Sequence, residues 1–147
     1  MSTTTNVLAP AMAAIAAQLE TELGPVVDGV QVVPRMIVNP TPPCIDIFPA
    51  PEGFLEQTNF GVGNQHGLLV VRATVSTADQ EAGQDLLLDL LDPHGPTSVL
   101  QALMVDSSFG GAVDDSTVTA VTGFLSYTFD PAGGSLLGAE WRLDCLL

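Results

Sequence analysis

An amphipathic helix at the start of the chain is the feature that most restricts the possible folds. Apolar residues recur there at i, i+4, i+7, i+11 and i+15, the spacing of one helical face, and they are Leu8, Met12, Ile15, Leu19 and Leu23. We predict a helix over residues 6–23 that is capped by Asn6, carries Pro10 in its first turn and ends at Gly24-Pro25. The alanines between the larger apolar residues allow a sheet or another helix to approach closely.

Strand-like segments follow this helix without a regular alternation of strands and helices. They lie at residues 26–38, 44–48, 68–75, 117–129 and 137–146. Arg72 is expected on the more polar face of its strand. The turn sequence at residues 130–134 predicts an antiparallel hairpin between the last two strands. Residues 49–67 are rich in Gly, Pro and Asn and show no period, so we predict a functional or mobile loop that could reach a neighbouring subunit.

Two more helices are predicted between the third strand and the hairpin. The first spans residues 77–91, with capping-box spacing from Thr77 to Gln80, and the second is a short helix at residues 97–105. This order predicts an α+β fold, with a mixed, mostly antiparallel sheet and two main helices packed on it. A length of 147 residues fits one domain over residues 1–147, in which the polar residues 1–5 are expected to be loose.

The charge inventory is strongly one-sided. The chain has 17 acidic residues, three arginines and no lysine, which gives a net charge of -14. Binding to nucleic acid depends on Lys and Arg, so specific DNA binding is not expected, although a duplex could pass close by without sticking. Charged residues are 14% of the chain and hydrophobic residues 46%. Apolar surface is therefore expected to be buried against another chain, although an alanine-rich composition biased by a GC-rich genome accounts for the same values.

Motifs for catalysis, metals and cofactors do not occur in the sequence. His66 and His94 are isolated, and the glycine-rich segment 61–67 is one residue too long for a dinucleotide fingerprint. We therefore predict no catalytic residues, no metal and no cofactor, and a protein that is not an enzyme. A small hydrolase built on Asp114 or Asp115 and a ligand-binding module with a closed apolar pocket remain as alternatives.

The two cysteines and the apolar segments bear on the cellular location. Cys44 and Cys145 lie in apolar runs and are predicted to be buried free thiols in a reducing compartment. The sequence shows no secretory signal, because Arg35 is its first basic residue. The longest apolar stretch, residues 7–17, is too short to span a bilayer. The protein is therefore expected to be made in the cytoplasm and to have no membrane partner.

Two sets of residues are candidates for contacts with partners. The first is an acidic stripe on the helix predicted at 77–91, opposite its leucines, formed by Glu81, Asp85, Asp89 and Asp92. This stripe is either a solvated helix face or an acidic wall that faces a channel or a basic partner. The second set is a candidate interface of aromatic residues, Trp141, Phe54 and Phe60. Packing in the core is the alternative role of Trp141.

The whole pattern resembles a known family. An alanine-rich first helix, proline-rich early strands, the segment 78–87 (ADQEAGQDLL) and a hairpin ending in 138–143 (GAEWRL) are similar to the tail terminator proteins of long-tailed phages, especially phages of actinobacterial hosts. The similarity spans most of the chain, but no invariant motif defines the family. Its members share no catalytic residues, so none is assigned to this chain.

The resemblance implies a virion structural protein that is assembled in the host cytoplasm. Six copies would form a ring that caps the tail tube and stops its polymerisation. The implied partners are other copies of the chain, the major tail tube protein and the head-completion or stopper protein, while genomic DNA passes through the ring. A head-tail connector or stopper protein of the neck is the alternative.

Overall fold

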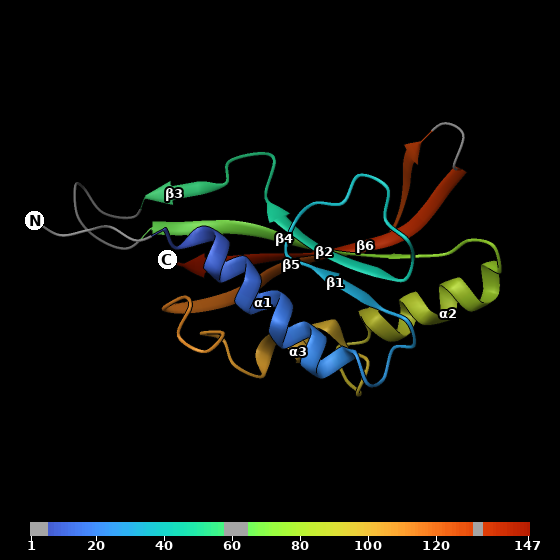
Figure 1. Cartoon of the computed structure of the whole chain (residues 1–147), viewed down its shortest axis with the longest axis horizontal. Helices are drawn as coiled ribbons and strands as arrows, with labels where there is room; N and C mark the ends of the chain where they lie inside the picture. Colours follow the sequence, from blue (N-terminus) through green and yellow to red (C-terminus); the bar gives the residue numbers. More distant parts are fainter. Residues whose placement is uncertain (1–5, 58–64, 131–133) are drawn as a thin grey trace, which may run out of the picture.

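The computed structural model describes residues 6–57, 65–130 and 134–147, and these residues form the predicted α+β fold. Three helices lie on one side of a single sheet (Figure 1). In chain order the elements are α1 (Leu8–Leu23), β1 (Gln31–Val33), β2 (Cys44–Pro49), β3 (Leu55–Gln57), β4 (Gln65–Val75), α2 (Gln80–Leu91), α3 (Val99–Met104), β5 (Asp115–Asp130) and β6 (Gly134–Leu146).

The sheet is mixed and mostly antiparallel, as predicted. Within the described ranges its strand order is β1-β2-β4-β6-β5, and the short β3 pairs with the first residues of β4. Only β1 and β2 run parallel. The predicted hairpin is confirmed, because β5 and β6 are antiparallel neighbours along most of their length. This order places β1 and β5 at opposite edges of the sheet.

The core lies between the sheet and the three helices. The helix face predicted from the sequence is buried in α1, except that Leu8 is half-buried. Alternate residues of the strands meet it, because side chains in a strand point to opposite faces in turn. Examples from β2, β4 and β6 are Ile47, Val71 and Trp141, all with no exposed surface.

Helix boundaries follow the predictions closely, but two caps differ. The residue before α1 is Val7, whose side chain makes no capping hydrogen bond, so the cap predicted at Asn6 is wrong. The capping box from Thr77 to Gln80 is also wrong, because Asp79 caps α2 by accepting a hydrogen bond from the Ala82 backbone N–H at 3.1 Å. Of the leucines on α2, Leu87 and Leu90 are buried.

The early strands and loops differ more from the sequence-based expectation. Only three residues of the strand predicted at 26–38 pair with the sheet, because a turn at Asp28 and Gly29 precedes them and residues 34–43 form a loop. The long loop predicted at 49–67 contains β3 and the first residues of β4. The looseness predicted for residues 1–5 lies outside the described residues. No helix in the described part of the chain has the length and hydropathy to cross a membrane.

Candidate interaction surfaces

The acidic stripe of α2 is exposed along its whole length, on the side opposite the buried Leu87 and Leu90. The exposed face of α2 also contains an apolar residue, which was not predicted to be at the surface. Leu88 is 54% exposed, and it lies three residues after Asp85 and four before Asp92. Residues at these spacings are neighbours on a helix surface. The exposed face of α2 therefore presents a leucine with a carboxylate on either side of it.

The three arginines have different surroundings. Arg72 is buried and paired with Asp46, and Arg142 lies 3.3 Å from the carboxylate of Glu52. Arg35 is exposed, and no described carboxylate lies within 4.0 Å of its guanidinium, which donates a hydrogen bond to the backbone carbonyl of Pro34. In a chain with a net charge of -14, Arg35 is therefore a local positive site that the described acidic residues do not neutralise.

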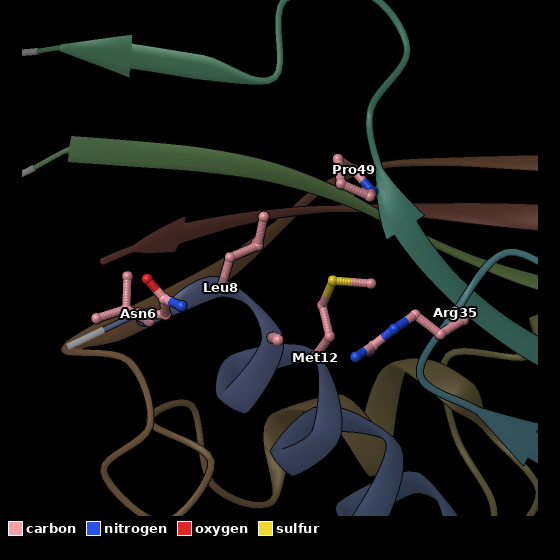
Figure 2. A pocket seen from close by; sticks show the side chains of 7 residues that line it. Asn6, Leu8, Met12, Arg35 and Pro49 are labelled. Carbon is pink, nitrogen blue, oxygen red and sulfur yellow. The ribbon is translucent and has the colours of Figure 1, made fainter.

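Arg35 lies at an apolar cleft of about 620 Å³ between the start of α1 and the end of β2. Figure 2 shows the Arg35 side chain extending toward Met12, with Leu8 and Pro49 above it and Asn6 just before the start of α1. The first turn of α1 has no acidic residue and no side-chain cap. The positive end of the helix dipole therefore adds to the charge of Arg35 at this cleft. The site suits an apolar side chain with an adjacent carboxylate.

The two edges of the sheet are unlike each other. β1 is short and is followed by Arg35, whereas β5 is long and pairs only with β6 among the described strands. No charged residue occurs between Asp115 and Asp130, and the exposed residues of β5 include Val121 and Phe124. An edge strand without charges can pair with another chain, although the bulges in β5 make this edge irregular.

A buried polar cluster lies on the sheet face opposite the helices. Asp46 and Arg72 are cross-strand neighbours in β2 and β4, and Asp46 accepts two hydrogen bonds from the guanidinium. The loop after β1 covers the pair, because the Ile37 backbone donates to Asp46 at 3.0 Å and accepts from Arg72 at 2.9 Å. Phe48 and Tyr127 lie on the guanidinium, with ring centroids 5.1 and 5.3 Å away. The cluster fixes this loop, and through it the position of the cleft.

Tyr127 and Glu140 extend this cluster toward β5. The Tyr127 hydroxyl donates a hydrogen bond of 2.7 Å to the Glu140 carboxylate. Burial, followed by the bond to Glu140, raises the pKa of Tyr127 far above its ordinary value. The phenol therefore stays protonated and acts as a fixed donor. The position of Arg72 on a polar face is as predicted from the sequence, whereas its pairing with Asp46 and the Tyr127–Glu140 pair were not predicted.

Among the described residues, His66 and Asp144 form the pair whose geometry most resembles that of a catalytic His–Asp pair. The His66 Nδ1 atom lies 2.9 Å from the Asp144 carboxylate, beside a pocket of about 120 Å³ that Asp115 and Ser116 also line. The Ser116 hydroxyl donates to the Ser107 carbonyl at 2.6 Å and is therefore engaged. Hydrogen bonds, first from the Ser107 side chain and then from the Ser116 backbone, lower the pKa of Asp115, which makes its carboxylate a weaker base. Among the described residues that line this pocket, the Ser116 hydroxyl and the Asp115 carboxylate are therefore not activated as nucleophiles.

The three aromatic residues of the candidate interface have different positions. Trp141 has no exposed surface and belongs to the core, so its assignment to the interface is wrong and its core role is confirmed. Phe54 is half-buried and packs against the core, so its contact with a partner stays a prediction. Phe60 lies outside the described residues.

Both cysteines are buried free thiols, as predicted. Burial, with a smaller contribution from Asp46, raises the pKa of Cys44 to about 11, and burial with a contribution from Asp144 raises that of Cys145 to about 12. The thiolate is the reactive form, and at pH 8 it is roughly 0.1% of Cys44 and less of Cys145.

We therefore expect neither thiol to react with iodoacetamide at pH 8 within minutes in the folded protein, and both to react in concentrated urea. Mass spectrometry of the alkylated protein measures this directly. A variant with an added surface thiol, Val7→Cys, should be alkylated once under native conditions, because Val7 is 47% exposed. Rapid native labelling of Cys44 or Cys145 would show that the surrounding packing opens easily.

No model of a known protein family matches the chain, and no curated protein matches its sequence. Function must therefore be argued from the surfaces themselves.

Proposed function

We propose that this protein is a virion structural protein, a phage tail terminator whose copies close into a hexameric ring on the tail tube. The observation that supports the ring is that the described sheet has two unlike edges, β1 beside a cationic cleft and β5 with no charged residue between Asp115 and Asp130. Contacts between unlike surfaces repeat from copy to copy and generate a ring if the rotation closes.

The charge distribution supports passage of DNA through such a ring. A net charge of -14 with one exposed, unneutralised arginine among the described residues gives a duplex no basic stripe to bind. Repulsion between like charges then keeps the DNA moving freely through the opening. The proposed contacts of the ring are the major tail tube protein on one side and the head-completion or stopper protein on the other, within the virion neck.

Removal of the gene from its phage tests this function. Without a terminator, tube polymerisation has no stop signal, so we expect tails much longer than normal and heads without tails in electron micrographs. Tails of normal length joined to heads would contradict the proposal. Tails of normal length left unjoined would instead assign the protein to a connector or stopper of the neck.

The mass of the assembled protein gives an independent measurement. Native mass spectrometry of the purified protein, alone and bound to isolated tail tubes, should detect a six-copy ring in at least one of these conditions. A strict monomer even on tail tubes would contradict the ring.

A further inference from the structure

The exposed face of α2 and the Arg35 cleft are complementary in charge, and each includes apolar residues. The α2 face offers one exposed leucine, Leu88, between the carboxylates of Asp85 and Asp92. The cleft offers apolar walls, a volume of about 620 Å³ and the guanidinium of Arg35. A leucine side chain can enter such a cleft while a neighbouring carboxylate remains at its charged rim.

These two surfaces lie apart within one copy, the cleft at the start of α1 and α2 mainly over the inner strands β4 and β6. Arg35 follows the edge strand β1, and Pro49 ends the adjacent β2. The last turn of α2 also approaches β5, where a Cβ atom added to Gly123 would lie 3.0 Å from the Leu91 Cδ1 atom. Figure 1 shows α1 beginning at the left of the molecule and α2 at its right, toward opposite ends of the strands. The contact is therefore suited to join neighbouring copies.

Charge identifies a second copy as the occupant of the cleft. Two acidic proteins with a net charge of -14 repel each other over most of their surfaces. The acidic face of α2 has no basic residue of its own helix beside it, and Arg35 is the exposed arginine left without a described carboxylate. Pairing the two surfaces neutralises a charge on each side at the place where two copies meet.

We propose that the acidic face of α2 in one copy docks into the Arg35 cleft of the next, with Leu88 in the cleft and Asp85 or Asp92 paired with Arg35. This contact rests on the proposed ring function and specifies how neighbouring copies meet. Because it joins unlike surfaces, each copy uses its cleft for one neighbour and its α2 for the other.

Disulfide trapping tests the contact directly. Val7 lines the cleft and Leu88 is on α2, and both are about half exposed, at 47% and 54%. A mixture of Val7→Cys and Leu88→Cys chains should form covalent dimers on mild oxidation, and the double variant should form a ladder of larger oligomers. The matched control pairs Leu88→Cys with Met104→Cys, which is 61% exposed at the end of α3 and does not line the cleft.

The outcomes separate this contact from the ring itself. Rings seen by native mass spectrometry or on tail tubes, with no Val7–Leu88 crosslink, would overturn the docking proposal and leave the ring intact. Crosslinking of Leu88→Cys chains with each other, or equally with Met104→Cys, would also overturn it. Absence of any ring under all conditions would contradict the proposed function and, with it, the contact that rests on that function.

A charge exchange supplies a second measurement. Arg35→Glu should weaken association of the copies by about tenfold or more, because it places a carboxylate against the acidic face of α2. Combining it with Asp85→Arg or Asp92→Arg should recover most of the loss in one of the two pairs. Glu20→Arg, an equal charge change on an exposed part of α1 beyond the cleft, should not recover it. Unchanged association of Arg35→Glu would contradict the contact.

Discussion

Replacement of Asp46 by alanine is expected to lower the free energy of unfolding by about 3–5 kcal/mol, because it leaves the buried Arg72 guanidinium without its carboxylate. Both side chains are almost fully buried, with Asp46 1% and Arg72 6% exposed. The two hydrogen bonds between them and the bond from the Ile37 backbone to Asp46 are lost together. Urea unfolding followed by fluorescence of the single tryptophan measures the change.

Two variants determine whether the loss comes from the buried charge. Asp46→Leu combined with Arg72→Met removes both charges and should recover part of the stability, since an apolar pair of similar size avoids an uncompensated ion. Recovery will be incomplete, because the Ile37 backbone groups lose their partners. Asp28→Ala, at an exposed carboxylate, should change stability by less than about 0.5 kcal/mol. A loss below about 1 kcal/mol in Asp46→Ala would refute this account of the cluster.

The Asp46–Arg72 pair also marks a limit of sequence reasoning. Asp46 is the one acidic residue of β2 and Arg72 the one arginine of β4, and opposite charges in two apolar runs are a usable signal of a pair. Pairing them requires knowing that β2 and β4 are neighbours in a register that places Asp46 opposite Arg72. Strand order and register depend on contacts between distant segments, so the local pattern does not contain them.

Features set by local periodicity were predictable, and features joined across the chain were not. The buried face of α1 and the exposed stripe of α2 follow from helical spacing alone. The Arg35 cleft is built from the start of α1, the loop after β1 and the end of β2, three segments far apart in sequence. Of the strand predicted at 26–38 only β1 forms, because the flanking residues lie in a turn and a loop in which Val26, Met36 and Val38 are exposed.

Trp141→Ala is expected to cost about 3–5 kcal/mol of unfolding free energy, the usual range when a large buried aromatic side chain is removed. Trp141 lies in β6 between Val71 of β4 and Val121 of β5, and it has no exposed surface. Because the tryptophan signal is lost, circular dichroism must follow the unfolding. Phe124 in β5 is 43% exposed, so Phe124→Ala should lower the free energy of unfolding by only about 0.5 kcal/mol or less.

Trp141→Phe separates the volume of this side chain from its polar atom. The buried Nε1–H of Trp141 has no hydrogen-bond acceptor among the described residues. A buried donor without a partner costs about 1–3 kcal/mol, so phenylalanine removes this cost while it leaves a smaller cavity than alanine. The two effects oppose each other, and we expect a net change within about 1.5 kcal/mol of zero. A loss as large as that of Trp141→Ala would mean that the indole N–H is satisfied in solution, for example by water, and that the core around it is not dry.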